Sequence, residues 1–257
     1  MASIHPTAIV DAAAEVADDV EIGPYSVVGP HVAIGAGTKL MSHVVVEGHT
    51  RIGAKCTLFP FCSIGQQTQD LKYRGGIAYV EIGDRTTIRE YVTVNAATDD
   101  GDTTRIGQQC HIMAYAHVAH DCQVGNEVII ANCGSLAGHV VVEDQVILGG
   151  LSGVHQFVRI GRLAIVGGCS KVTQDVPPFM MADGNPLQVH GVNAVGMKRK
   201  NISSESQRAV KQAYRTLYRD RLPPKQALEK LAVDGDQPDE ILHLIHFIKA
   251  SERGITR

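Results

Sequence analysis

Aliphatic side chains recur at every sixth position through the first two thirds of the chain. In one phase they run from Ile4 to Ile64, from Ile82 to Val94 and from Ile106 to Val172, and glycine often follows directly. The two breaks keep the phase because each spans a multiple of six residues. A period of six matches neither the 3.6-residue period of a helix nor the simple alternation of a long strand. It predicts short strands separated by regular turns, with the aliphatic residue pointing inward.

Hexapeptide repeats of this kind form a parallel β-helix, in which three hexapeptides make one triangular coil. Successive coils stack about 4.8 Å apart. The predicted fold class is therefore mainly β: a left-handed parallel β-helix over residues 1–185, followed by a small C-terminal α-helical domain over residues 186–257. The left-handed winding is a property of this repeat class, which departs from the usual right-handed crossover.

The two breaks in the repeat predict loops that leave the column at residues 66–81 and 95–105. Long loops on a rigid scaffold often carry function. A small residue usually stands two positions before the aliphatic one, where it fills the space beside it. Four cysteines hold this position, and we interpret them as packing residues rather than redox groups; they are Cys56, Cys62, Cys110 and Cys122.

The repeat ends at the two prolines of "QDVPPF", residues 174–179. Ser204 and Gln207 then stand at capping-box spacing, before apolar residues at helical intervals. Further helices are expected from about Lys225 and after Pro238. These segments predict a small helical domain packed beside the column.

Composition narrows the function classes. The chain has 257 residues, 44% of them hydrophobic, and a formal net charge of −3, which argues against a general nucleic-acid-binding protein. No apolar run is long enough to predict a membrane span, and the N-terminus lacks the basic and apolar segments of a signal peptide. Six cysteines without a C-x-x-C pair indicate reduced thiols, so we expect a cytoplasmic protein with no integral membrane contact.

Several histidines fall outside the inward phase of the repeat and recur at the spacing of one coil. Because a coil takes three hexapeptides, positions 138–139 should lie one coil above positions 120–121, and positions 155–156 one coil higher still. Solvated surface histidines would not favour one edge of the column, so the cluster indicates function. It comprises His117, His120, Asp121, Gly138, His139, His155 and Gln156.

Two kinds of chemistry suit this cluster. Neutral imidazoles could bind zinc, but the chain lacks the His-x-x-x-x-His element of the γ-class carbonic anhydrases, and we predict no metal and no other cofactor. The stronger hypothesis is general-base catalysis by His120, because histidine accepts a proton near neutral pH. Asp121 could orient the ring only at a turn, since neighbouring strand residues point apart. The Gly138 N–H could stabilise an oxyanion, in a direct transfer without a covalent enzyme intermediate.

The stretches "AHVAHDCQVGN", "LAGHV", "VHQF", "QDVPP" and "GMKRK" resemble the UDP-N-acetylglucosamine acyltransferase family of lipid A biosynthesis, as do "QDLKY" and "SERGITR". The resemblance runs from residue 4 to the C-terminus. It implies transfer of a (3-hydroxy)acyl group from acyl carrier protein to the sugar 3-hydroxyl of UDP-N-acetylglucosamine. It also implies a homotrimer, with each cleft between two columns.

The resemblance assigns roles to individual residues. His120 is the expected general base, Asp121 its partner, and Gly138 the oxyanion donor. Gly168 and Lys171 stand at positions that measure the acyl chain, although the chain length does not follow from them. The basic run at residues 198–200 is either exposed surface or a region that steers the acidic carrier protein. Substrate contacts are expected from Asp70, Lys72, His117, His139, His155, Gln156, Asn193 and Arg199.

The chain departs from the family pattern near the expected sugar-nucleotide region. Asn95, Ala96 and Ala97 replace a His-Arg-Gly stretch, and Val195 replaces an acid. Some relatives acylate a 3-amino sugar analogue, so the acceptor atom stays open between a 3-hydroxyl and a 3-amino group. Two further alternatives are a coenzyme A-dependent acetyltransferase of the same repeat class and a β-helix without enzymatic activity.

Overall fold

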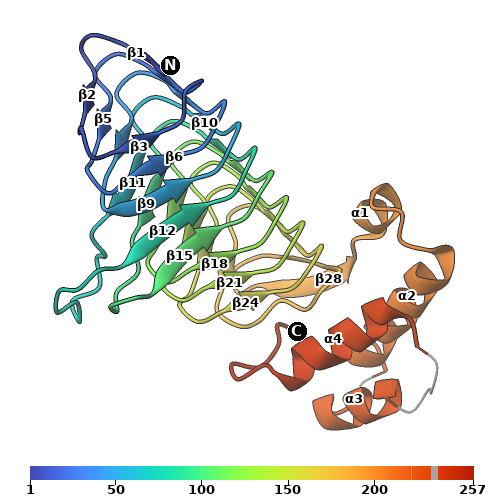
Figure 1. Cartoon of the computed structure of the whole chain (residues 1–257). Coiled ribbons are helices and arrows are strands. Elements are labelled where there is room, and N and C mark those ends of the chain that lie inside the picture. Colours follow the sequence, from blue (N-terminus) through green and yellow to red (C-terminus); the bar gives the residue numbers. More distant parts are fainter. Residues whose placement is uncertain (221, 233–236) are drawn as a thin grey trace.

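The computed structural model describes residues 1–220, 222–232 and 237–257. The repeat region winds into a triangular column, and the helical region lies beside the C-terminal end of that column (Figure 1). Three sheets form the sides of the described column, and within the coils all of their strands pair in parallel. We call them sheets A, B and C in the order in which the chain first enters them.

Most strands are two residues long, as short strands between regular turns require. Sheet A contains β1 (Ser3–Ile4), β4 (Glu21–Ile22), β7 (Lys39–Leu40), β10 (Thr57–Leu58), β13 (Thr87–Ile88), β16 (His111–Ile112), β19 (Ile129–Ile130), β22 (Ile147–Leu148), β25 (Ile165–Val166), β27 (Met180–Asp183) and β28 (Gln188–Val192). Sheet B contains β2 (Ile9–Val10), β5 (Val27–Val28), β8 (Val45–Val46), β11 (Ser63–Gln66), β14 (Thr93–Asn95), β17 (His117–Val118), β20 (Ser135–Leu136), β23 (Gly153–Val154) and β26 (Lys171–Val172). Sheet C contains β3 (Glu15–Val16), β6 (Ala33–Ile34), β9 (His49–Ile52), β12 (Tyr79–Ile82), β15 (Thr103–Ile106), β18 (Gln123–Val124), β21 (Val141–Val142) and β24 (Arg159–Ile160).

Each regular coil of the column contains three hexapeptides. Ile4 therefore pairs with Ile22 in sheet A, and Val118 pairs with Leu136 in sheet B. Because the period of the sequence and the period of the coil agree, the inward residues of successive coils stack directly on one another. The parallel β-helix and its hexapeptide repeat are confirmed.

Turns at the corners of the triangle require an unusual backbone conformation. Non-glycine residues with positive φ recur at intervals of six, among them Tyr115 (63°), Asp121 (60°) and His139 (59°). This left-handed conformation is uncommon for residues with a side chain. Hydrogen bonds between coils, such as His139 N to His120 O at 3.1 Å, hold the corner residues in it. The side chains of two adjacent residues can therefore project from the same corner.

The interior of the column is a stack of aliphatic side chains. From Ile22 to Val172 the inward residues of the repeat are buried, which is the main source of stability for such a column. The first coil differs, since Ile4 is 45% exposed and Val10 and Val16 are only partly buried. Their inward faces lie at the open end of the column, so only the following coil covers them.

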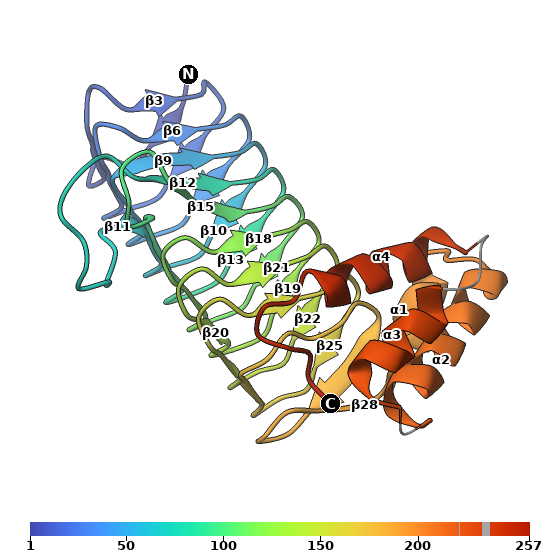
Figure 2. The same cartoon turned by 90° about the horizontal axis from the view of Figure 1, so that it is seen from below.

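Both interruptions of the repeat leave the column at one corner, between sheets B and C (Figure 2). Leu58 pairs with Ile88 and Thr87 pairs with His111, so both pairings span more than three hexapeptides of sequence. The excursions cover residues 67–78 and 96–102, and are shorter than the expected loops at 66–81 and 95–105. The difference arises because β12 and β15 are four residues long and pair in register along their whole length.

The helical region contains more structure than its sequence pattern indicated. β27 and β28 form an antiparallel hairpin that extends sheet A to Val192, so the boundary expected at residue 185 lies inside this hairpin. A short helix, also unexpected, follows it. The helices of the described residues are α1 (Ala194–Arg199), α2 (Ser204–Tyr218), α3 (Pro224–Ala232) and α4 (Asp239–Lys249), and none of them is long and apolar enough to cross a membrane.

The cap of α2 lies one residue before the position expected from the sequence. Ser203 is the N-cap, and its Oγ accepts a hydrogen bond from Ser206 N at 3.0 Å. The Gln207 side chain donates to the carbonyl of Ile202 at 2.8 Å and therefore does not complete a capping box with Ser204. A Ser-Ser pair offers two caps of equal chemistry, so the sequence alone could not choose between them.

A buried carboxylate joins the end of the chain to the column. Asp175 is 1% exposed, and its two side-chain oxygens accept hydrogen bonds from Arg159 N at 2.8 Å and Ser251 Oγ at 2.7 Å. Its backbone pairs with that of Gly254 and Thr256. The helical region is therefore fixed to the last coil, and is not a freely moving appendage.

Thiol reactivity should reflect the packing of the repeat. Burial raises the pKa of Cys62 and Cys122 to about 12 and that of Cys110 to about 11, so these thiols stay protonated at neutral pH. With Ellman's reagent at pH 8, Cys56, Cys62, Cys110 and Cys122 should react only after unfolding in guanidinium, when all six cysteines become reactive. Rapid labelling of Cys122 in native protein, located by peptide mass mapping, would contradict this packing role.

Candidate active site

The polar residues predicted from the coil arithmetic meet at the corner between sheets B and C, which we call the loop corner. His120, His139 and Phe157 project there from three successive coils. The rings of His120 and His139 are 5.2 Å apart and meet edge to face, and His139 stacks on Phe157 at 4.6 Å. Because the two excursions leave the column from the preceding coils at the same corner, they cover the N-terminal side of this cluster.

His120 and Asp121 face each other although they are sequence neighbours. The positive φ of Asp121 turns its carboxylate back toward the imidazole, and His120 Nδ1 lies 2.7 Å from Asp121 Oδ2. The side chains are 13% and 8% exposed. An ionised carboxylate can only accept a hydrogen bond, so Nδ1 carries the proton and Nε2 has its lone pair free. This is the tautomer that a general base needs.

Gly138 lies directly behind the His120 ring. A Cβ at this position would come within 2.3 Å of His120 Cε1 and 2.5 Å of Nε2, so only glycine leaves room for the imidazole. The Gly138 N–H makes no hydrogen bond to any described residue, although the residue itself is buried. An unpaired backbone donor beside the free Nε2 is the arrangement that oxyanion stabilisation requires.

Asp70 and Lys72 lie in the first excursion and reach the same corner. The Lys72 N–H donates to Asp70 Oδ1 at 2.9 Å and lowers the pKa of Asp70; desolvation opposes this effect, and the neighbouring His120 adds to it. Asp70 is thus an anion within electrostatic range of the imidazole. The motif that contains both residues therefore lies near the histidine cluster.

A groove runs along the outer face of sheet B, next to the loop corner. It has a volume of about 440 Å³ and is lined by small and apolar side chains together with His117, His155 and Lys171. His117 Nδ1 lies 2.7 Å from Thr93 Oγ1, and burial, with a contribution from His120, lowers the pKa of His117 so that it is neutral at pH 7. The groove can hold an extended apolar chain beside the base.

Gly168 and Gln156 flank this groove from opposite corners. Gly168 lies at the turn that precedes β26 between sheets A and B, where an added Cβ would meet Gly150 O at 3.3 Å. Gln156 is exposed beside Phe157 at the loop corner, and its backbone carbonyl oxygen lies 3.1 Å from His155 Nδ1.

Asn193 and Arg199 do not reach the loop corner of their own chain. Asn193 is the buried N-cap of α1: its Oδ1 accepts from Gly196 N at 2.8 Å, and its Nδ2 donates to Leu163 O at 2.9 Å. Arg199 is exposed at the last turn of α1, and the adjacent Lys200 pairs with Glu127 at the corner between sheets C and A. The sequence did not predict α1, so it could not show that Asn193 and Arg199 lie away from the histidine cluster.

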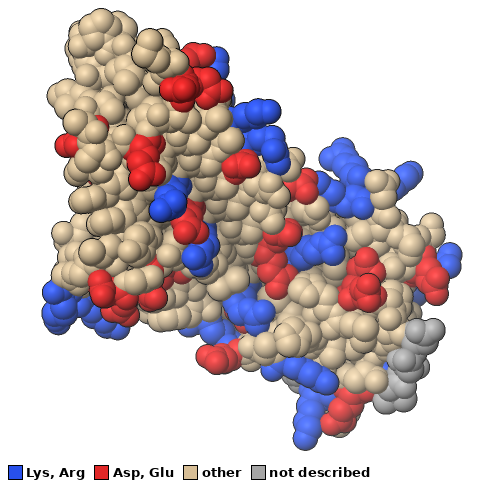
Figure 3. Space-filling model, in the orientation of Figure 1, with Lys and Arg blue, Asp and Glu red and all other residues tan. Residues whose placement is uncertain are grey.

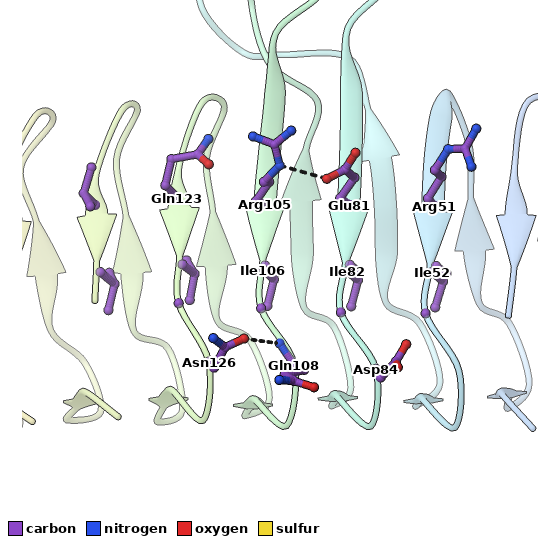
Figure 4. A pocket seen from close by; sticks show the side chains of 17 residues that line it. Arg51, Ile52, Glu81, Ile82, Asp84, Arg105, Ile106, Gln108, Gln123 and Asn126 are labelled. Carbon is purple, nitrogen blue, oxygen red and sulfur yellow. Dashed lines mark hydrogen bonds and ion pairs between the residues drawn. The ribbon is translucent and has the colours of Figure 1, made fainter. Parts of the chain in front are cut away.

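Another hollow, on sheet C, is less suited to catalysis. It has a volume of about 740 Å³, and its side chains form rows that run across neighbouring strands (Figure 4). The charged groups neutralise one another, as Arg105 Nε lies 2.8 Å from Glu81 Oε2. Gln108 N donates to Asn126 Oδ1 at 3.0 Å to tie adjacent turns together. The described residues that line the hollow include no histidine, and its carboxylates are engaged, Glu81 by Arg105 and Asp84 by Ala54 N, so we place the active site at the loop corner.

The loop corner also contains a candidate set of metal ligands. One nitrogen or oxygen atom from each of His120, Asp121 and His139 lies within 4.8 Å of the others. Asp121 Oδ2 is 3.6 Å from His139 Nε2 but only 2.7 Å from His120 Nδ1. The shorter contact has the length of a charge-assisted hydrogen bond, which is the role we assign to the pair.

Known proteins resemble this chain over its full length. A sequence-family model described as UDP-N-acetylglucosamine O-acyltransferase, domain 2, matches residues 175–256, and one described as bacterial transferase hexapeptide (six repeats) matches residues 103–138. The acyl-[acyl-carrier-protein]–UDP-N-acetylglucosamine O-acyltransferase of Thermodesulfovibrio yellowstonii is 51% identical over 258 residues, which cover 100% of both chains.

Solved structures agree with the sequence relatives. The UDP-N-acetylglucosamine O-acyltransferase of Moraxella catarrhalis is 44% identical over 99% of both chains, with a TM-score of 0.94. The UDP-N-acetylglucosamine acyltransferase of Francisella novicida is 36% identical over 99% of this chain and 94% of its own, with a TM-score of 0.96. Structures of this kind are left-handed β-helices with a C-terminal helical region, in agreement with the winding expected from the repeat class.

Replacing Gly138 should test the packing behind the imidazole. Gly138→Ala puts a methyl group where the His120 ring lies, so the ring must move. Turnover should fall about 100-fold, within the usual range for a displaced general base. The melting temperature should change little, because Gly138 does not adopt the positive φ that disfavours alanine. A variant with full turnover and an unmoved ring in its crystal structure would contradict this packing role.

Proposed function

The chain belongs to the family of acyl-[acyl-carrier-protein]–UDP-N-acetylglucosamine O-acyltransferases, and on this basis we propose that it moves an acyl group from acyl carrier protein to UDP-N-acetylglucosamine with His120 as the general base. This transfer is the first step of lipid A synthesis. The observation that supports the role of His120 is the 2.7 Å contact between its Nδ1 and Asp121, which leaves Nε2 free next to the unpaired Gly138 N–H.

The transfer then proceeds in one displacement. Nε2 of His120 takes the proton of the acceptor hydroxyl while the hydroxyl oxygen attacks the thioester carbonyl. The Gly138 N–H holds the oxyanion of the tetrahedral intermediate, and Asp121 stabilises the imidazolium. Collapse breaks the carbon–sulfur bond, and the imidazolium returns its proton to the leaving thiolate. No enzyme nucleophile is needed, so the acyl group never becomes attached to the protein.

The two substrates are assigned to different sides of His120. Asp70 and Lys72 approach from the loop side, and we assign them, with His139 and Gln156, to the acceptor sugar nucleotide. The sheet B groove suits the acyl chain because small side chains line its floor. Lys171 lines its far part, two coils beyond Ser135, and we assign it with Gly168 to the end that limits chain length.

The donor requires a surface that an acidic carrier protein can approach. Figure 3 shows Lys and Arg side chains gathered around α1 in a molecule whose net charge is −3. Lys198 and Arg199 occupy the last turn of α1 and are exposed. A local cluster of this sign speeds the encounter with an acidic partner. We therefore assign residues 198–200 to carrier-protein steering.

We propose a homotrimer because the predicted site is incomplete in one chain. Arg199 is exposed beside the corner between sheets C and A, away from the loop corner that contains His120, so these two side chains can meet only across copies, whereas Asn193 is committed to the cap of α1. An exposed ladder of stacked rings provides a packing surface at the corner between sheets A and B, with neighbouring centroids 4.8 to 5.0 Å apart. It comprises Tyr25, His43, Phe61, Tyr91 and Tyr115. Sheet B lies between this ladder and the loop corner, so a neighbour on the ladder would close the groove.

The departures from the family pattern bear on the acceptor. Asn95 is buried and ties the end of β14 to the first excursion, since its Oδ1 accepts from Gln69 Nε2 at 3.3 Å and its Nδ2 donates to Gln67 O at 3.2 Å. Its amide is thus committed to loop structure. Ala96 and Ala97 line a hollow of about 370 Å³ under the first excursion. These residues leave the 3-amino sugar nucleotide as the second candidate acceptor. We assign the reaction to the cytoplasm, since all six cysteines are free.

Turnover assays of His120→Ala test the proposed base. Mass spectrometry should detect acylated UDP-N-acetylglucosamine with wild-type protein and 3-hydroxyacyl carrier proteins of mixed length. The variant should lose about 10²- to 10⁴-fold in kcat, the usual contribution of a positioned general base. Parallel reactions with the 3-amino analogue, and with acetyl coenzyme A as donor, distinguish the alternatives. Equal turnover by wild type and variant would exclude His120 as the base.

Disruption of the ring ladder should separate the copies. Tyr91→Glu places a charge between Phe61 and Tyr115 and should convert a particle of about three times 27.6 kDa into a monomer in light-scattering measurements. Activity should fall although His120 and Asp121 are unchanged. Tyr79→Glu, an exposed aromatic on sheet C, is the matched control and should remain trimeric. A wild-type protein that is monomeric and fully active would exclude the trimer.

A further inference from the structure

Thr98, in the second excursion, touches both members of the proposed base pair. Its Oγ1 lies 3.0 Å from His120 Nδ1, and its backbone N lies 3.3 Å from each carboxylate oxygen of Asp121. The residue is 7% exposed, so water cannot easily replace these contacts. No feature of the repeat predicts them, because Thr98 lies outside the hexapeptide phase.

His120 Nδ1 carries a single proton, and this determines which atom donates and which accepts in each of these hydrogen bonds. The Nδ1 proton of His120 points to Asp121, so the Thr98 oxygen can act only as a second acceptor of that proton. The Thr98 hydroxyl proton is then available to Thr68 Oγ1, which lies 2.9 Å away. Thr68 is 5% exposed and has no role in the column, since it belongs to the first excursion.

The same chain of contacts continues to the predicted sugar-binding residues. Thr68 Oγ1 accepts a hydrogen bond from Asp70 N at 3.1 Å, and Asp70 Oδ1 accepts from Lys72 N at 2.9 Å. The two excursions are also joined through Ile77 N and Asp100 Oδ1 at 2.7 Å, and Ala96 N of the second excursion donates to Gln66 O at the end of β11 at 2.9 Å. A rigid pair of loops thus connects Asp70 to the imidazole through two buried hydroxyls.

We propose that Thr98 is a positioning residue that holds His120 and Asp121 in register with the first excursion, through Thr68 and Asp70. The inference rests on the proposed role of His120 as the base. The Thr98 oxygen restrains rotation of the imidazole, and its backbone N–H restrains the carboxylate. Thr68 transmits the position of the Asp70–Lys72 segment to this pair, so that the ring is aligned when the acceptor sugar is bound.

Substitution of the hydroxyls alone tests this role. Thr98→Val keeps the shape and the backbone N–H but removes the oxygen, and kcat should fall about 10- to 100-fold, as expected for one hydrogen bond to a group that becomes charged. The KM for acyl carrier protein should stay constant. Thr98→Ser retains the oxygen and should restore most of the rate. Thr68→Val leaves the imidazole contact intact and should mainly raise the KM for the sugar nucleotide.

The double variant Thr68→Val, Thr98→Val measures the coupling. If the two hydroxyls form one connection, its kcat/KM for the sugar nucleotide should equal that of Thr98→Val; effects on kcat/KM that multiply independently would overturn the connection. Thr86→Val removes another buried hydroxyl, which donates to Gly107 O at 2.8 Å away from the loop corner, and controls for general loss of stability. Unchanged kcat in Thr98→Val beside an inactive His120→Ala would overturn this inference alone. An active His120→Ala would instead overturn the assignment of the base.

Discussion

Backbone hydrogen bonding between successive coils is the constraint on which the whole structure depends. Each coil exchanges backbone hydrogen bonds with the coils on either side along three parallel sheets, as from His117 N to Gly134 O at 3.0 Å. The register repeats every three hexapeptides. Side chains one coil apart are therefore held about 4.8 Å from each other. The column converts a distance along the sequence into a fixed distance in space, and His120, Gly138 and Gln156 are brought together by this conversion alone.

The column itself could be predicted from the sequence because one period governs it. Every inward residue obeys the same spacing, so a count of aliphatic positions predicts the sheets and the corner at which the histidines meet. Structure outside the period could not be predicted in this way. The contact of Thr98 with His120 depends on how two irregular loops fold against each other. The β27–β28 hairpin and α1 depend on packing at the end of the column, which no local pattern encodes.

The site combines conformations that are individually unfavourable. Asp121 and His139 adopt positive φ, and Gly138 is buried with an N–H that has no partner among the described residues. In an isolated turn each of these features would relax. Here the coils above and below restrain them, so the stability of the hydrophobic stack holds reactive groups in place before any substrate arrives. Rate enhancement through such preorganised polar groups needs little rearrangement during the reaction.

The lengths of the two excursions have a consequence for how this architecture can change. The pairings of Leu58 with Ile88 and of Thr87 with His111 show that the inserted segments are equivalent to two hexapeptides and one hexapeptide. If either segment had been wound into the column, every later residue would have moved around the triangle by one or two faces. The histidines would then lie on a different side of the column from the loops. Extruding them as loops preserves the angular alignment of all later coils. Insertions at a corner are thus geometrically neutral, whereas those within the winding must come in whole coils.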